Sequence, residues 1–146
     1  MIKRLDCLGI TEGLNLKRLT LAIVAVFIWI LASDFVVHQL LLKSAYQATP
    51  NLWRTDSEIQ EHMVWMLLGQ FLIAKFFTLI FAKGYTGKGL IEGVRFGLLA
   101  AFLTIGHYLI QYAVNPLTCS IALAWIGAAI VQSVLAGMVA AAIYRQ

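Results

Sequence analysis

Four long apolar segments, separated by short polar ones, dominate the pattern of this chain. They cover about residues 19–42, 63–82, 90–114 and 117–144. A helix needs about 20 apolar residues to cross the roughly 30 Å hydrocarbon core of a bilayer, and each segment reaches that length. The pattern therefore predicts an all-α polytopic membrane protein, an antiparallel bundle of four transmembrane helices. The polar segments are too short to fold alone, so residues 1–146 are expected to form one integral membrane domain.

Composition and charge support a lipid environment. Hydrophobic residues make up 61% of the chain and charged residues only 12%, which leaves too few polar side chains to coat a water-soluble globule. The formal net charge is +4. Because the basic residues gather at the ends of the apolar segments, they fit lipid headgroups better than nucleic acid. We therefore expect the lipid bilayer, and no nucleic acid, as a partner.

The distribution of basic residues predicts the orientation of the helices. With a cytoplasmic N-terminus, seven of them lie inside and two outside, which agrees with the excess of lysine and arginine on cytoplasmic loops. The inside set is Lys3, Arg4, Lys17, Arg18, Lys83, Lys88 and Arg145, and the outside set is Lys43 and Arg54. Both termini are expected in the cytoplasm.

Two local patterns predict where helices begin and turn. Thr55 followed by Glu58 has the spacing of a capping box, so the second helix is expected to start near Asp56 and run on into the bilayer. Only Asn115 and Pro116 separate the third and fourth segments. Such a short connection predicts a tight antiparallel hairpin.

Small residues recur at every fourth position on the third and fourth segments. The first stripe is Gly89, Gly93, Gly97 and Ala101, and the second is Ala129, Ser133, Gly137 and Ala141. Stripes of this kind let two helix backbones approach closely in lipid. Because both stripes lie in the cytoplasmic halves of adjacent antiparallel helices, we favour packing within one chain over a homodimer face, which stays an alternative.

Polar residues inside the apolar segments are expected in two layers. The outer layer is Asp34, His38, His62, His107 and Gln111. Aspartate and histidine carry protons and bind metals, but no metal-ligand motif accompanies them, so an interhelical hydrogen-bond clamp is favoured over a proton or metal site. Haem held by the histidines is an unsupported alternative, and no metal or cofactor is predicted.

The inner layer is Lys75, Glu92, Arg95 and Gln132. An unpaired ammonium at the depth of Lys75 costs on the order of 3 kcal/mol. Glu92 is the acidic residue expected nearest to it, with Arg95 as a competitor for that carboxylate. A Lys75–Glu92 pair and a lysine that extends along its own helix to the inner surface are equally compatible with the sequence.

Five short strings resemble a group of small four-span bacterial membrane proteins with no assigned activity. They are Leu41-Leu42-Lys43, Leu52-Trp53-Arg54, Leu68-Gly69-Gln70, Lys83-Gly84-Tyr85 and Glu92-Gly93-Val94-Arg95-Phe96-Gly97. The resemblance extends over about residues 34–144 and implies a bacterial inner (cytoplasmic) membrane location. It supplies no catalytic residues.

The sequence favours an accessory or structural subunit of a larger membrane complex, with other membrane-protein subunits as partners. The chain is small and carries no nucleophile motif, so an enzyme is not predicted. The alternative is a small homo-oligomeric transporter or channel that uses the intramembrane aspartate, histidine and lysine residues. The gap between the two polar layers counts against a continuous path.

Overall fold

The computed structural model describes residues 10–144 and is all helical over that range. In chain order the elements are α1 (Leu16–Asp34), the π-helix η2 (Phe35–Leu41), α2 (Lys43–Gln47), the 3-10 helix η3 (Pro50–Leu52), α3 (Asp56–Glu61), α4 (Met63–Gly84), α5 (Leu90–Val114) and α6 (Cys119–Ile143). This confirms the expected all-α class.

Four of the described helical segments are long and apolar enough to cross a membrane: Leu16–Leu41, Met63–Gly84, Leu90–Val114 and Cys119–Ile143. The first begins before Leu19 because the Asn15 side chain caps it, accepting a hydrogen bond of 3.1 Å from the backbone N–H of Arg18. The last begins after Leu117 because Thr118 is its N-cap. The third has the expected bounds.

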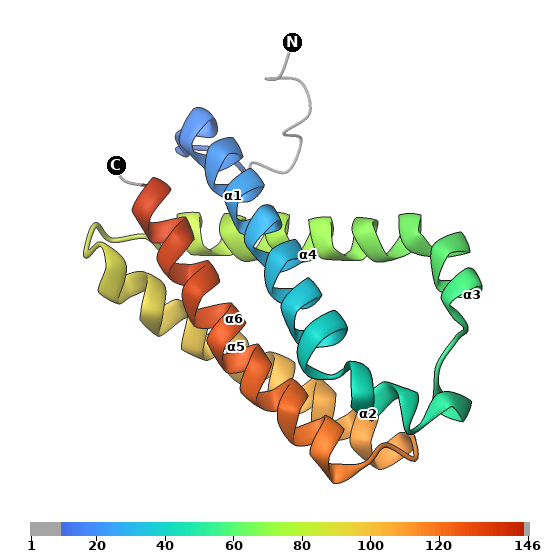
Figure 1. Cartoon of the computed structure of the whole chain (residues 1–146). Coiled ribbons are helices and arrows are strands. Elements are labelled where there is room, and N and C mark those ends of the chain that lie inside the picture. Colours follow the sequence, from blue (N-terminus) through green and yellow to red (C-terminus); the bar gives the residue numbers. More distant parts are fainter. Residues whose placement is uncertain (1–9, 145–146) are drawn as a thin grey trace.

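Helices α1 and α5 run in one direction and α6 in the other, so their ends lie at two opposite ends of the molecule, while α4 crosses them at a steep angle (Figure 1). At one end the ring of Tyr85, which follows α4, lies 5.9 Å from the ring of Tyr144, which follows α6. Lys83 Nζ donates there to the carbonyl oxygen of Glu12, just before α1. At the other end, residues of α2 meet the first half of α6 through the Tyr46–Trp125 hydrogen bond. Because the chain has four candidate spans, an even number, the start of the first span and the end of the last lie at the same end of the molecule.

α5 and α6 form the most extensive helix contact, and small residues make it possible. A side chain added at Gly93 would collide with the backbone carbonyl of Gly137, and one at Gly97 would lie 2.6 Å from the Cα of Val134. Ser133 contributes its backbone carbonyl at the same place. The two stripes therefore face each other within one chain, with backbones close enough for many weak contacts.

Gly89 does not take part in this helix contact, although it continues the four-residue spacing. Its φ of 69° lies in the left-handed region, and a Cβ built there would meet open space. It is the N-cap of α5, where the chain turns into the helix. A glycine accepts this backbone conformation without the steric cost that other residues have.

α4 is steeply inclined to the other long helices and crosses α1, its main neighbour (Figure 1). The buried side chains of α4 all lie in its second half: Ala74, Thr78, Leu79, Phe81 and Ala82. The first half projects beyond the contact with α1, and Val64 and Trp65 are 71% and 70% exposed there. Helix α4 is therefore packed mainly through its second half, and Gln70 and Phe71 add contacts to α1 from the end of the first half.

The capping box predicted before the second span is present. The backbone N–H of Thr55 donates to Glu58 Oε2 at 2.8 Å, and the backbone N–H of Glu58 donates to Thr55 Oγ1 at 3.4 Å. The Thr55 backbone N–H and hydroxyl both donate to the Glu58 carboxylate, which favours its ionised form and lowers the pKa of Glu58. The helix does not continue into the bilayer as expected, because α3 ends at Glu61 and α4 starts at Met63 after a break at His62.

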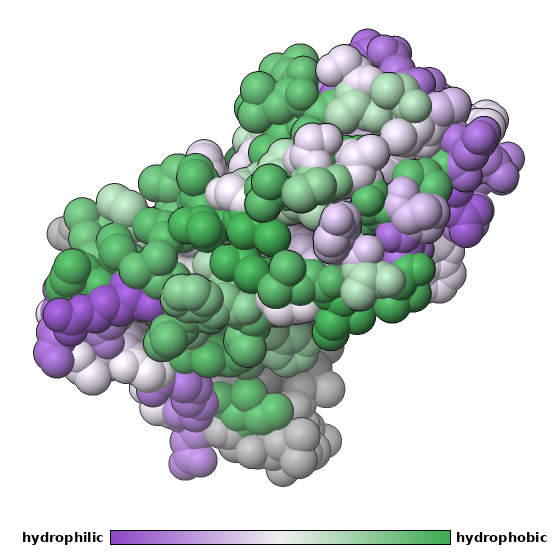
Figure 2. All heavy atoms as spheres, turned by 90° about the horizontal axis from the view of Figure 1, so that it is seen from below, coloured by the Kyte–Doolittle hydropathy of each residue, from purple (hydrophilic) through white to green (hydrophobic). Residues whose placement is uncertain are grey.

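The molecular surface matches a bilayer environment. On the face shown in Figure 2, apolar side chains cover the middle of the molecule and hydrophilic ones gather at its ends. Large exposed apolar residues occur along all four long helices, such as Ile28 on α1, Ile73 on α4, Leu103 on α5 and Leu123 on α6. Apolar side chains exposed on this scale are typical of helices that face lipid.

Candidate functional site

Three of the long helices meet at the carboxylate of Asp34, the last residue of α1. Gln70 of α4 donates from Nε2 to Asp34 Oδ2 at 2.6 Å, and Gln132 of α6 donates from Nε2 to Asp34 Oδ1 at 2.6 Å. The same Gln132 nitrogen lies 2.7 Å from Ser33 Oγ. We call Ser33, Asp34, Gln70 and Gln132 the polar junction. All four side chains are partly buried.

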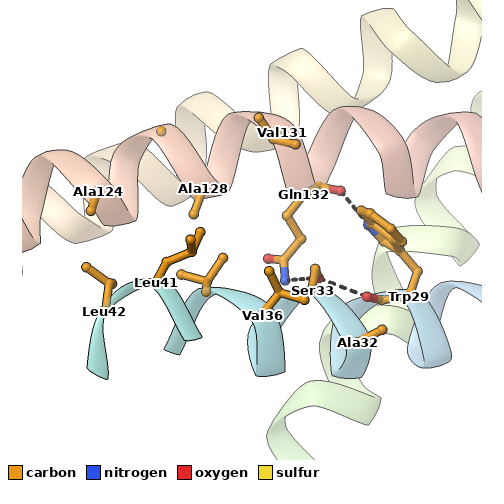
Figure 3. A pocket seen from close by; sticks show the side chains of 12 residues that line it. Trp29, Ala32, Ser33, Val36, Leu41, Leu42, Ala124, Ala128, Val131 and Gln132 are labelled. Carbon is orange, nitrogen blue, oxygen red and sulfur yellow. Dashed lines mark hydrogen bonds between the residues drawn. The ribbon is translucent and has the colours of Figure 1, made fainter. Parts of the chain in front are cut away.

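Neighbouring residues of α1 fix the side chains of the junction. Ser33 Oγ donates to the carbonyl oxygen of Trp29 at 2.8 Å, which leaves its lone pairs for Gln132. Trp29 Nε1 in turn donates to the main-chain carbonyl of Gln132 at 3.0 Å. Side chain and backbone of Gln132 thus both bind α1, and this double attachment sets how α6 lies along it (Figure 3).

The helix changes type directly after Asp34. Over η2 the backbone bonds span five residues, as in the bond from the Leu42 N–H to the Val37 carbonyl at 2.9 Å. π-helical turns are rare and occur frequently at functional sites. Here the wider turns carry His38 toward the following helix, α2.

An aromatic cluster closes the bundle beyond the junction. The hydroxyl of Tyr46 accepts a hydrogen bond from Trp125 Nε1 at 2.8 Å and lies 2.6 Å from His38 Nδ1. Tyr46 and Trp53 have ring centroids 4.8 Å apart, and Tyr108 packs on Trp125 at 5.4 Å. Burial raises the pKa of the Tyr46 phenol. The cluster joins η2 and α2 to α5 and α6.

The five residues expected in one outer layer lie in separate places. Asp34 binds Gln70 and Gln132, while His38 binds Tyr46. The His62 ring lies 2.7 Å from the Glu58 carbonyl on the exposed α3 segment. His107 and Gln111 are neighbours on an exposed stretch of α5, with 3.5 Å between their side-chain nitrogens. They do not reach Asp34 because α1 packs mainly on α4 and α6.

The expected inner layer also separates. Glu92 accepts hydrogen bonds from the backbone N–H groups of Thr86 at 2.6 Å and Lys88 at 3.0 Å. Both carboxylate oxygens are therefore used to order the loop before α5, and of the two alternatives expected for Lys75 the pair with Glu92 is not formed. Lys75 is exposed, with Nζ 5.5 Å from the centre of the Phe76 ring, and Arg95 is exposed as well.

Gln132, which was expected in the inner layer, belongs to the polar junction. Gln70 was not predicted as a site residue. Depth counted along each helix assumes that the helices are parallel, but α4 is steeply inclined and crosses α1 (Figure 1), and Gln70 is the residue of α4 that reaches Asp34. A glutamine in an apolar segment is a visible signal of an interhelical hydrogen bond. Its partner depends on the helix crossing, which the segment alone does not encode.

A cavity of about 560 Å³ adjoins the junction between α6 and the first span (Figure 3). Val36, Val37 and Leu41 of η2 line one side, and the small residues Ala124, Gly127 and Ala128 line the facing side of α6. Trp29, Ser33 and Gln132 lie at the end next to the junction. The lining is almost entirely apolar.

Fold and site together define the class of this protein: an all-helical, multi-pass membrane protein in which a carboxylate and two amides join three of its helices. Among residues 10–144 no group of three histidine, cysteine, aspartate or glutamate side chains is placed to hold a metal ion. No protein-family model, curated protein or solved structure matches the chain.

Proposed function

We propose that this chain is an accessory subunit of a larger membrane complex, and that α4 is the helix that binds its partner. The observation that carries the proposal is the position of Lys75. The residue is exposed and lies nine residues, or about 14 Å along the helix, from the end of α4. No acidic side chain within residues 10–144 forms an ion pair with it. An uncompensated ammonium in hydrocarbon costs on the order of 3 kcal/mol.

The compensating carboxylate is best supplied by a different protein. Within the described spans the acidic residues are Asp34 and Glu92, and both carboxylates already accept hydrogen bonds on each oxygen. A second copy of this chain therefore offers no unoccupied carboxylate from its described spans. An aspartate or glutamate on the transmembrane helix of another protein would fit, because polar pairs give helix association in lipid its specificity.

The first half of α4 supports the same proposal. Apart from the contact of Gln70 with Asp34 and of Phe71 with Phe27, it exposes apolar side chains, including Leu72 at 43% and Ile73 at 60%. Few contacts join α4 to α5. A partner helix would pack along this half of α4 and place its carboxylate next to Lys75, which lies just beyond it.

The alternative function, a homo-oligomeric transporter or channel, has less support than an accessory subunit. A transport path needs polar groups that follow one another across the bilayer. Asp34, His107 and Lys75 belong to three separate surroundings, and no hydrogen bond within residues 10–144 joins one of these side chains to another. The accessory-subunit proposal uses Lys75 without such a path.

A photocrosslinking experiment in the native membrane tests the proposal. A photoreactive phenylalanine derivative replaces Leu72, three residues from Lys75 on the same helix face. In a control protein it replaces Leu103, which is 81% exposed on α5. We expect a discrete protein adduct from position 72 and none from position 103. Adducts from both positions, or from neither, would contradict a partner bound at α4.

Substitution of Lys75 then tests the charge. Lys75→Met is expected to reduce the adduct about tenfold, the change that corresponds to roughly 1.4 kcal/mol, while Lys75→Arg retains it. Lys88→Met removes a positive charge from the loop outside the hydrocarbon and serves as the matched control. An adduct that is unchanged in Lys75→Met would mean that the ammonium is held by lipid phosphates and not by a partner.

A further inference from the structure

We propose that the cavity between α6 and the first span binds one acyl chain of a bilayer phospholipid. The lining contains no charged side chain. The donor groups of its polar side chains are already engaged: Trp29 Nε1 donates to the Gln132 carbonyl, Ser33 Oγ donates to the Trp29 carbonyl, and Gln132 Nε2 donates to Ser33 and Asp34. A ligand therefore finds hydrocarbon contacts along the walls and no unpaired charge to satisfy, which selects a hydrocarbon chain.

The cavity is kept open by local structure on both of its sides. Ala124, Gly127 and Ala128 follow the three- and four-residue spacing of one face of α6, so their small side chains leave space. A Cβ built on Gly127 would meet nothing within 4 Å. On the facing side the π-helical turns of η2 form the wall. At the α5–α6 contact, small residues let two backbones pack closely, whereas the small residues here leave a cavity.

The cavity opens sideways toward the lipid. Three residues at its rim are strongly exposed: Val36 at 45%, Leu41 at 69% and Val131 at 58%. Along α1 and η2 the lining runs from Trp29 to Leu42, a length of roughly 20 Å in helical rise. One leaflet of a bilayer contributes roughly 15 Å of hydrocarbon, so one acyl chain fits the length of the cavity.

A basic residue follows the cavity lining at the end of the first span. Lys43 directly follows Leu42, the last lining residue of the first span, and its side chain is exposed. An ammonium at the end of a span meets the phosphate of a lipid headgroup. This favours a phospholipid over a neutral lipid such as diacylglycerol. The site lies on the α1–α6 side and does not depend on a partner at α4.

Native mass spectrometry of the full chain, released from nanodiscs of phosphatidylglycerol, measures lipid retention. We expect one retained phosphatidylglycerol for the unmodified chain and for Gly106→Leu, and loss of it for Gly127→Leu, whose side chain fills the cavity. Gly106 is a matched control because a Cβ there also meets open space. Circular dichroism and a thermal midpoint verify that both variants are folded.

Two results would overturn the proposal. One is equal retention of phosphatidylglycerol by folded Gly127→Leu and Gly106→Leu. The other is equal retention of diacylglycerol and phosphatidylglycerol by the unmodified chain, since the phosphate would then play no part. As a check of position, phosphatidylglycerol with a diazirine in one acyl chain is expected to label residues of the cavity, such as Ala128, and to lose this labelling in Gly127→Leu. Labelling that persists there would count against the cavity.

Discussion

The single residue that connects most of this molecule is Gln132. Its amide nitrogen binds Asp34 and Ser33, and its main-chain carbonyl accepts from Trp29. Asp34 thereby gains two neutral donors, one from Gln132 and one from Gln70, in a region where water is not available to solvate a carboxylate. The donors are side chains that rotate little once packed, so the carboxylate holds α4 and α6 to α1.

Replacement of Gln132 is expected to weaken the fold. Gln132→Leu keeps the volume but leaves Asp34 with one donor fewer, so the free energy of unfolding in micelles should fall by about 1–2 kcal/mol. Gln39→Leu, at an exposed position of η2, is the matched control and should change it little. Equilibrium unfolding with a denaturing detergent measures both. Equal effects of the two variants would contradict a structural role for the junction.

At the scale of elements, the α5–α6 hairpin is the part of the fold that the sequence specifies best. A small residue at every fourth position places the gaps on one face of a helix, whatever the rest of the molecule does. The short Asn115-Pro116 connection makes the two helices adjacent and antiparallel. The structure adds that backbone carbonyls of Gly137 and Ser133 occupy the places where side chains of Gly93 and Gly97 would be.

Filling one of these gaps should separate the two helices. Gly97→Ala puts a methyl group against the backbone of α6, and the strain is expected to cost about 1–3 kcal/mol of unfolding free energy. Gly106→Ala, in open space on the same helix, should be neutral or slightly stabilising, because alanine favours helix. Thermal unfolding of both variants in micelles gives the comparison. A stable Gly97→Ala would refute the close backbone contact.

For the whole molecule, the expected orientation in the membrane remains a prediction. The structure gathers the start of α1, the α4–α5 loop and the end of α6 at one end, and α2 with the α5–α6 turn at the other (Figure 1). Among the described basic residues outside the spans, Lys17, Arg18, Lys83 and Lys88 belong to the first end, and Lys43 and Arg54 follow the first span at the other. Which membrane the protein occupies also remains a prediction. Residues 1–9 and 145–146, with Lys3, Arg4, Cys7 and Arg145, lie outside the described part.

Cys119 provides a test of this orientation. It is exposed at the start of α6, beside the turn from α5, and Cys7→Ser leaves it as the only cysteine of the chain. A membrane-impermeant maleimide should label the Cys7→Ser protein in intact cells. Cys119→Ser, which retains Cys7, should be labelled only after the membrane is permeabilised. The reverse pattern would place the termini outside.

The sequence by itself determined the membrane class, the four spans, the capping box at Thr55 and the facing small-residue stripes. Each of these depends on residues within one helix or on two helices joined by a short turn, so spacing along the chain is enough. Tertiary structure alone decided the partners of the isolated polar residues. Asp34 meets Gln70 and Gln132, and Glu92 binds backbone instead of Lys75, because the inclination of α4 and the crossing of α1 with α6 set which depths coincide. Those angles result from packing between distant segments, and no local pattern records them.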